Sequence, residues 1–191
     1  MDTDLSGTTT LIVEDEVDLA ELYATWLRLS GSTVQVANSG AEASERLAVA
    51  ETPFDVAVLD RRLGDSTGSE VLGQIRREMP DTRVVMLTAV TPDVDILSMP
   101  FNEYLVKPVS GTDLVDTVAE MLARGRYLDC VDELYVALRK LTLLQANTSD
   151  AQLRADPEYR KLTEEVETLR EEADDAFGAL DSPAGVLKEL A

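Results

Sequence analysis

The sequence contains no histidine, one cysteine and only four lysines among its 191 residues. Histidine is the side chain that most often moves protons in catalysis, so its absence disfavours an enzyme of phosphatase type. A single cysteine, Cys130, excludes an internal disulfide and fits a reducing cytosol, and its apolar helical surroundings predict a small core residue. No apolar run reaches the length of a membrane span, and residues 1–7 do not resemble a signal peptide. We therefore expect a cytoplasmic protein without a membrane anchor.

Basic residues are scarce in general: 17 stand against 37 acidic ones, which gives a formal charge of −20 and a pI of about 4.2. Such a charge disfavours non-specific contact with nucleic-acid phosphates or anionic lipids. An acidic, lysine-poor surface is typical of a halophile protein in multimolar salt, where the screening length falls to about 3 Å or less. An acidic protein of an ordinary cytosol is the alternative.

Short apolar, β-branched runs alternate with helical spacing over the first two thirds of the chain. The runs predict strands over residues 8–13, 34–37, 54–60, 83–88 and 103–106. Spacings of three and four predict helices over 17–29, from Ser39 to before Pro53, over 68–79, and from Thr112 or Asp113 onward. Pro92 and Pro100 limit any helix within 90–102 to a turn or two. This alternation predicts an α/β domain over residues 1–124, with a five-stranded parallel doubly wound sheet.

Residues 125–191 have the pattern of an all-α region. One stripe comprises Leu128, Val131, Tyr135, Leu138 and Thr142, widened by Leu134, Leu141 and Leu144, and we expect the helix after Thr112 to continue into it. Residues 147–155 are polar and interrupt the pattern. Asp156-Pro157-Glu158 then predicts a capped helix start, followed by a heptad seam at Leu162, Val166, Leu169, Ala173, Ala176 and Leu180. A helical hairpin, a coiled-coil dimer or both are predicted.

The predicted strands end on polar side chains that suit phosphoryl chemistry. Glu14 and Asp15 follow the first strand, while Asp60, Thr88 and Lys107 end the third, fourth and fifth. Carboxyl ends of parallel strands meet at one edge of the sheet, where ligands bind. Carboxylates suit Mg²⁺, while a lysine and a threonine can contact phosphoryl oxygens. Each residue alone is more often a solvated turn, a cap or packing, but together they predict an aspartyl phosphate on Asp60.

In their order and spacing, four segments resemble the receiver domain of two-component response regulators over roughly residues 8–124. They are Leu11-Ile12-Val13-Glu14-Asp15, Val58-Leu59-Asp60, Leu87-Thr88-Ala89 and Tyr104-Leu105-Val106-Lys107-Pro108. The resemblance implies a flavodoxin-like receiver fold with Asp60 as phospho-acceptor. It also implies Mg²⁺ held by Asp15, by Asp60, by the backbone carbonyl of Arg62 and, partly through water, by Glu14.

The same resemblance implies roles for the last two strands. Thr88 would bind a phosphoryl oxygen, Lys107 would pair with the phosphoryl group, and Tyr104 would be an aromatic switch. The bond between Lys107 and Pro108 would be cis. No catalytic residue beyond these is implied.

Two residues near the acceptor suggest a slowly hydrolysed phosphoaspartate. Val90, two residues after Thr88, cannot hydrogen-bond an attacking water, and bulky Arg62 stands two residues after Asp60. The segment between Thr88 and Lys107 is also short. This short segment, the Asp60-Arg61-Arg62-Leu63 loop and the acidic helical C-terminus together resemble haloarchaeal response regulators that carry a HalX domain, over essentially the whole chain.

We therefore expect a phosphorelay protein, rather than an enzyme, whose partners are a sensor histidine kinase and a second copy bound through the helical region. A DNA-binding transcriptional regulator is the alternative. It is disfavoured because residues 127–191 contain 15 acidic and 7 basic residues, a net charge of −8, and no evident helix-turn-helix. A coiled-coil scaffold with a degenerate receiver is disfavoured because the acceptor set is intact.

Overall fold

The computed structural model describes residues 3–89 and 94–178, without the side chain of Asp95. The chain forms two compact units, residues 1–121 and residues 122–191. The first holds a sheet covered by helices, and the second is a helical hairpin.

Five strands make up the sheet of the first unit: β1 (Thr9–Val13), β2 (Thr33–Ala37), β3 (Val56–Asp60), β4 (Arg83–Thr88) and β5 (Glu103–Val106). All pairings are parallel, in the order β2-β1-β3-β4-β5, which confirms the predicted doubly wound sheet. The register pairs Val13 with Leu59 and Asp60 with Leu87. The carboxyl ends of β1, β3 and β4 therefore lie at one edge.

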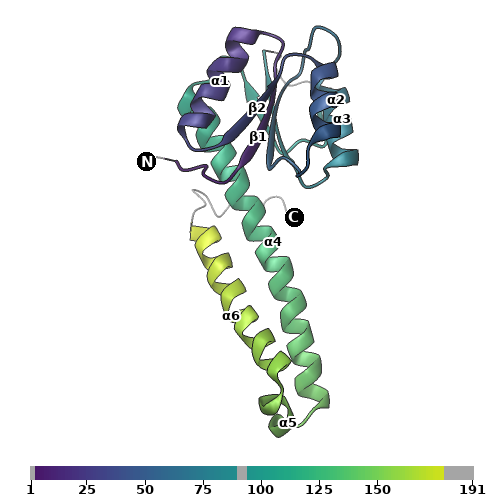
Figure 1. Cartoon of the computed structure of the whole chain (residues 1–191), viewed down its shortest axis with the longest axis vertical. Coiled ribbons are helices and arrows are strands. Elements are labelled where there is room, and N and C mark those ends of the chain that lie inside the picture. The colour runs from purple at the N-terminus through teal and green to yellow at the C-terminus, as the bar shows by residue number, and fades with distance from the viewer. Residues whose placement is uncertain (1–2, 90–93, 179–191) are drawn as a thin grey trace. The chain divides into compact units, whose positions relative to one another are not determined.

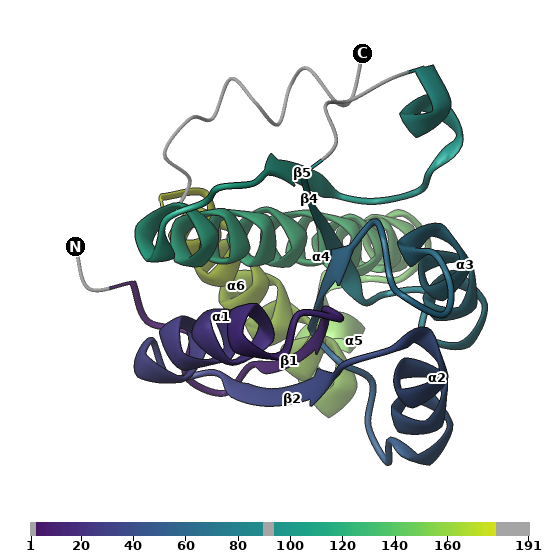
Figure 2. The same cartoon turned by 90° about the horizontal axis from the view of Figure 1, so that it is seen from above.

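Helix α1 (Val17–Leu29) lies on one face of the sheet, and α2 (Gly40–Val49) and α3 (Gly68–Glu78) lie on the other (Figures 1 and 2). Alternate strand residues point to each helical layer, so β1 and β3 are buried on both faces. Ser39 caps α2 as predicted by accepting a hydrogen bond from the backbone of Glu42, and Thr67 and Glu70 form a capping box at α3.

Between β4 and β5, the described residues 94–102 contain a short 3₁₀ helix, η1 (Val94–Ser98). This agrees with the prediction of no more than a turn or two before Pro100. Val90 and Pro92, on which part of that prediction rested, lie outside the described residues.

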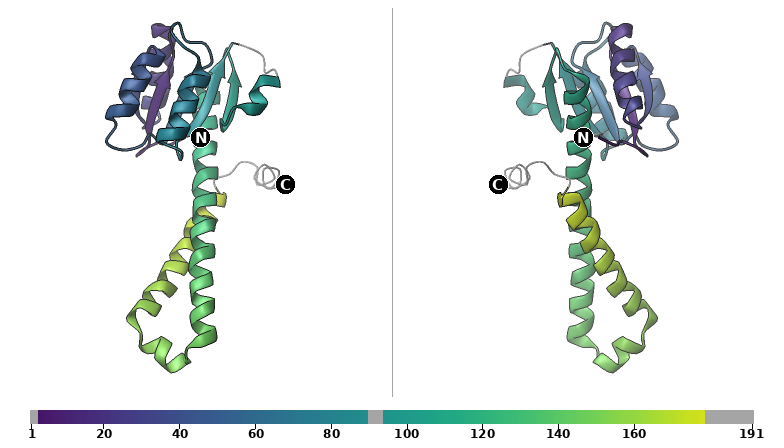
Figure 3. Two further views of the ribbon diagram at one scale, coloured as in Figure 1. Left: turned by 90° about the vertical axis from the view of Figure 1, so that its right-hand side faces the viewer. Right: turned by 90° about the vertical axis from the view of Figure 1, so that its left-hand side faces the viewer.

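Three helices follow β5 within the described residues: α4 (Gly111–Asn147), α5 (Asp150–Ala155) and α6 (Pro157–Gly178). Helix α4 is continuous over 37 residues, as expected from the stripe that follows Thr112. It buries Leu114, Val118 and Met121 within the first unit and then forms the first arm of the hairpin. Figure 3 shows the chain turning through α5 into α6.

The predicted helical hairpin is confirmed, but the polar linker is not simply irregular. It contains α5, whose Leu153 is buried at 5% exposure. The predicted start of α6 is confirmed because Asp156 Oδ1 accepts hydrogen bonds from the backbone N–H groups of Glu158 and Tyr159, at 2.8 and 3.3 Å.

The predicted stripe of α4 is confirmed in part, because Leu141 is buried in the hairpin core and Leu134 and Leu138 pack against it. Val131 and Tyr135 are 37% and 64% exposed, whereas the core consists of Ala137 and Leu141 from α4 with Val166 and Leu169 from α6. The α6 seam is as predicted at Val166, Leu169 and Ala173, which are buried, while Leu180 lies outside the described residues. The core that this seam forms is centred about a quarter of a turn around α4 from the predicted stripe. Cys130 is half-buried rather than a core residue.

Candidate functional site

Glu14 and Asp15 directly follow β1, whose residues 10–13 are fully buried. The backbone N–H of Glu14 donates to the carbonyl of Ala37 at 3.1 Å, and its carbonyl accepts from Asn38 Nδ2 at 3.0 Å. These bonds fix the strand end, and the Glu14 side chain is only 1% exposed while Asp15 is exposed. Sequence reasoning did not find Asn38, because no strand pattern marks it.

Asp60 is the last residue of β3 and is 9% exposed. Its Oδ1 accepts a hydrogen bond from the backbone N–H of Arg62 at 3.0 Å. The following loop folds back through a bridge between Arg62 and Thr67, flanked by Gly68 N–H to Arg61 C=O at 3.0 Å. A Cβ atom on Gly68 would lie 2.1 Å from the carbonyl oxygen of Asp60, so only glycine fits there.

Lys107 joins the two strand ends through its ammonium group. Its Nζ lies 2.6 Å from Glu14 Oε2 and 2.6 Å from Asp60 Oδ2, and its side chain is only 11% exposed. The peptide bond between Lys107 and Pro108 is cis, as the resemblance implied. The ring centroid of Tyr23, from α1, lies 6.0 Å from Nζ.

The buried charges shift the protonation equilibria of this group. Burial raises the pKa of Glu14 to about 7, helped by the charge of Asp60, although the hydrogen bond from Lys107 opposes the rise. Burial lowers the pKa of Lys107, but its hydrogen bonds to Asp60 and Glu14 outweigh this and hold it above its ordinary value. The positive charge of Lys107 therefore balances the adjoining carboxyl groups of Glu14 and Asp60.

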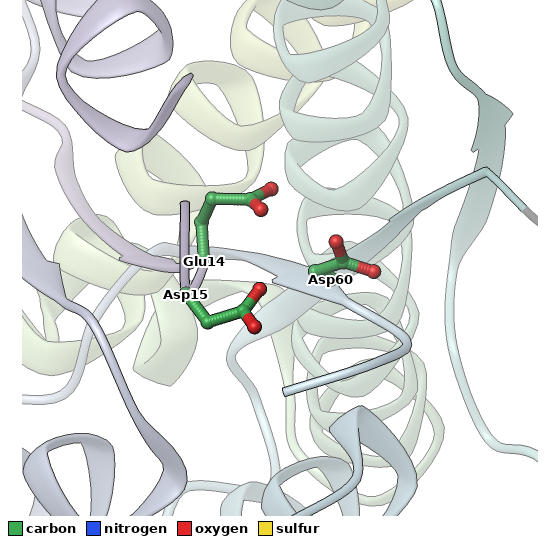
Figure 4. Close-up of side chains that lie close together, drawn as sticks. All are labelled: Glu14, Asp15 and Asp60. Atoms are coloured by element: carbon green, nitrogen blue, oxygen red, sulfur yellow. The ribbon is translucent and has the colours of Figure 1, made fainter. Parts of the chain in front are cut away.

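Glu14, Asp15 and Asp60 form the candidate metal centre. One carboxylate oxygen from each lies within 4.8 Å of the other two, and Figure 4 shows Glu14 and Asp15 pointing toward Asp60. Glu14 Oε1 is buried and has no hydrogen-bond partner among the described residues. Such an oxygen suits a cation or its bound water, and a set of carboxylates is the donor set that Mg²⁺ prefers.

The last predicted ligand is the backbone carbonyl of Arg62. The hydrogen bonds on either side of the Arg62–Thr67 bridge use the carbonyls of Arg61 and Ser66 instead. The three carboxylates of Glu14, Asp15 and Asp60 therefore fit a magnesium ion, and the Arg62 carbonyl stays a prediction.

Thr88 and Tyr104 lie on the neighbouring strands. Thr88 ends β4, is fully buried, and its carbonyl accepts a hydrogen bond from the backbone of Lys107 at 2.8 Å. Tyr104 is half-buried in β5 and packs against Phe101 with ring centroids 5.5 Å apart. Thus the structure brings Glu14, Asp60 and Lys107 into direct contact and sets Thr88 on the same sheet edge.

Residues 10–119 match the family model of the response regulator receiver domain. The chain belongs to this receiver family. Residues 123–188 beyond the receiver domain match the HalX domain. A protein of Haloferax volcanii named as a transcriptional regulator is 39% identical over 87% of this chain, which is 28% of that protein.

The receiver domain is also similar to bacterial regulators and to solved structures. The Transcriptional regulatory protein CutR of Streptomyces coelicolor is 40% identical over 61% of this chain and 52% of its own length. The chain thus spans about half or less of the curated relatives described. The response regulator TrrA of Thermotoga maritima, solved in complex with Mg²⁺ and BeF, is 27% identical over 60% of this chain and 98% of its own, with a TM-score of 0.53.

A receiver domain protein from Clostridium thermocellum is 27% identical over 63% of this chain and 98% of its own, with a TM-score of 0.57. These similarities are those of signalling proteins of two-component systems and not of classical enzymes. Within residues 3–89 and 94–178 no helix is long and apolar enough to cross a membrane.

Proposed function

We propose that this protein accepts a phosphoryl group on Asp60 from a sensor histidine kinase and passes the signal to its helical region. One observation supports this most directly: Lys107 Nζ contacts both Asp60 and Glu14 at 2.6 Å. The buried acceptor therefore has a second carboxylate and a compact cation beside it. Phosphoryl transfer needs mainly positioning and neutralisation of charge, which such a group supplies.

In the proposed transfer, the Asp60 carboxylate attacks the phosphorus of a phosphohistidine on the kinase. A bond forms between the carboxylate oxygen and phosphorus, while the P–N bond breaks and its electron pair returns to the histidine nitrogen. The backbone N–H of Arg62 holds Asp60 Oδ1 and orients the carboxylate. Lys107 exchanges one of its carboxylate contacts for a phosphoryl oxygen, and the Thr88 hydroxyl binds another.

Magnesium, held by Glu14, Asp15, Asp60 and the Arg62 carbonyl, would neutralise the charge of the incoming phosphoryl group. Lys107 already faces two carboxylates, so its single positive charge does not also neutralise a phosphoryl group. Asp15 is exposed and would give a hydrated ion access from solvent, while Glu14 is buried on the inner side of the site.

The proposed output is a change in the helical region. When Thr88 and Lys107 follow the new charge, Tyr104 repacks and alters the surface beside β5. Helix α4 begins at Gly111, four residues after Lys107, and continues into the hairpin. We assign residues 1–124 to the receiver and 125–191 to an output region that associates with a second copy.

The phospho-acceptor is tested by treating the protein with acetyl phosphate and Mg²⁺ and recording its intact mass. Wild type should gain the mass of one phosphoryl group, and Asp60→Asn should gain none. Asp55→Asn is the matched control, because Asp55 precedes the same strand at its opposite end and its carboxylate accepts a hydrogen bond from the backbone N–H of Thr9. Phosphorylation that persists in Asp60→Asn would overturn the assignment.

We further propose that the phosphoaspartate hydrolyses slowly on its own. Arg62 is exposed two residues after Asp60, where its bulk hinders an attacking water. The lifetime is measured by intact mass after removal of acetyl phosphate, and a half-life of seconds would contradict the proposal. Because Val90 lies outside the described residues, Arg62→Ala is the variant of choice and should shorten the lifetime.

Transcriptional regulation through DNA is the second candidate, favoured by the names of the Haloferax volcanii and Streptomyces coelicolor relatives. The charge of −8 over residues 127–191 argues against the helical region as the DNA-binding part. Electrophoretic retardation of genomic DNA fragments, at the salt concentration where the protein is folded, decides between the candidates. Sequence-specific retardation that Asp60 phosphorylation changes would favour the DNA-binding one.

A further inference from the structure

Helix α4 carries an apolar surface on the side that α6 does not cover. Val131, Tyr135, Val136 and Leu143 are 37%, 64%, 51% and 58% exposed. With about 3.6 residues per turn, they share one side of the helix, about half a turn from the buried Ala137–Leu141 seam. We call these four residues the outer face of α4. A cluster of large exposed apolar side chains typically marks a site of protein contact.

Two opposite charges lie on the same side of the helix. Asp132 and Arg139 are seven residues, or about two turns, apart, and both are exposed. Neither forms an ion pair with another residue of the described chain. The outer face therefore presents a carboxylate near one end and a guanidinium near the other, with Tyr135 and Val136 between them.

We propose that the outer face binds the outer face of a second copy, with the two α4 helices antiparallel. A twofold axis near Tyr135 and Val136 places Asp132 of each copy opposite Arg139 of the other, so two ion pairs form. Parallel helices would instead place Asp132 against Asp132 and Arg139 against Arg139, and like charges that face each other disfavour a pairing. The arrangement deepens the proposed function, since it rests on the dimeric output suggested there.

The first experiment measures the mass of the full chain in solution by light scattering. It uses the lowest potassium chloride concentration at which circular dichroism shows the folded helix content, because salt screens exposed charges. Wild type should show twice the chain mass of 20.9 kDa. Tyr135→Glu should raise the dissociation constant at least about tenfold, as expected for a central aromatic residue of an interface.

Leu97→Glu is the matched control, because Leu97 is an 85% exposed leucine on η1 in the first unit. It should leave the mass unchanged. If Leu97→Glu dissociates the dimer and Tyr135→Glu does not, or if wild type is monomeric, the outer face is not the interface.

The polarity is tested by exchanging the two charges. Asp132→Arg and Arg139→Asp should each weaken association about tenfold, because each creates two like-charge contacts, and the double variant should restore it. An equimolar mixture of the two single variants should form heterodimers. In a parallel dimer both single variants would keep wild-type affinity, and that outcome would overturn the antiparallel arrangement.

Phosphorylation by acetyl phosphate separates this inference from the proposed function. All of these variants should still be phosphorylated on Asp60, because none of the substituted residues belongs to the phosphoryl site. If wild type is not phosphorylated but the charge exchange behaves as described, the dimer surface stands and the proposed function fails. If phosphorylation occurs and the charge exchange does not change the dimer affinity, the proposed dimer surface is wrong and the proposed function stands.

Discussion

The carboxylate of Asp65 accepts hydrogen bonds from the first two residues of α2: from the backbone N–H of Gly40 at 2.9 Å and from that of Ala41 at 3.0 Å. Those bonds lower the pKa of Asp65. Just before Gly40, Asn38 donates to the carbonyl of Glu14. The start of α2 thus connects the loop after β1, which carries Glu14, with the loop after β3, which follows Asp60.

Replacement of Asp65 by alanine should weaken magnesium binding without preventing phosphorylation. Without the anchor, the loop that carries the Arg62 carbonyl loses its connection to α2 and keeps its bridge to Thr67 and its hydrogen bond to Asp60. Residues that orient metal ligands typically contribute about 10- to 100-fold to affinity. We expect the Mg²⁺ concentration for half-maximal phosphorylation by acetyl phosphate to rise about tenfold, with the rate at saturating Mg²⁺ little changed.

Ser39→Ala provides the control for Asp65→Ala. Ser39 also accepts a hydrogen bond at the start of α2, from the backbone of Glu42, but it does not reach the loop after β3. It should cost about 1 kcal/mol of stability and leave the Mg²⁺ dependence unchanged. Equal shifts in both variants would mean that Asp65 acts only by capping the helix.

Gly68→Ala should impair both folding and phosphorylation. The added Cβ would lie 2.1 Å from the Asp60 carbonyl oxygen, so the strand end or the helix start must move. We expect a loss of about 1–3 kcal/mol in the free energy of unfolding and a slower phosphorylation rate. Gly73→Ala in the same helix is the control, because its Cβ meets only the flexible end of Arg77 at 3.5 Å. It should stabilise by about 0.5–1 kcal/mol; equal losses in both variants would contradict this account.

The sheet and most of the site could be predicted because strand ends are visible in the sequence. Buried parallel strands are continuous apolar runs, so the polar residue that ends each run, such as Asp60, can be recognised in the sequence. The contact between Asp65 and Gly40 could not be predicted, since it joins loops 25 residues apart and follows no periodicity. The buried side of α4 was predicted only in part for a related reason: several apolar stripes fit the helix, and packing against α6 selects the one that includes Ala137 and Leu141.

Leu169→Ala should unfold the hairpin without damaging the receiver. Leu169 is 6% exposed and belongs to the core formed by Ala137, Leu141 and Val166. Removing a buried leucine side chain costs about 2–5 kcal/mol, so amide exchange in α6 should accelerate strongly while that of β3 is unchanged. Glu164→Ala is the control, because this exposed residue should change stability by no more than about 0.5 kcal/mol. Faster exchange in β3 of Leu169→Ala would show that the two units unfold together.

Magnesium binding should strengthen as the pH rises toward neutrality and then level off. Burial raises the pKa of Glu14 to about 7, from 4.5 in the unfolded chain. Between these pKa values the metal-free folded protein binds one proton more than the unfolded chain. The stability that protonated Glu14 contributes is therefore complete below the pKa of the unfolded chain, and it is lost as the pH rises through the pKa of the folded protein. A magnesium ion competes with that proton, so its binding should release about one proton at about pH 6.

Calorimetry in two buffers of different ionisation enthalpy measures the release of this proton. Glu14→Gln should abolish it and flatten the pH dependence, whereas a flat profile in wild type would show that Glu14 is already ionised.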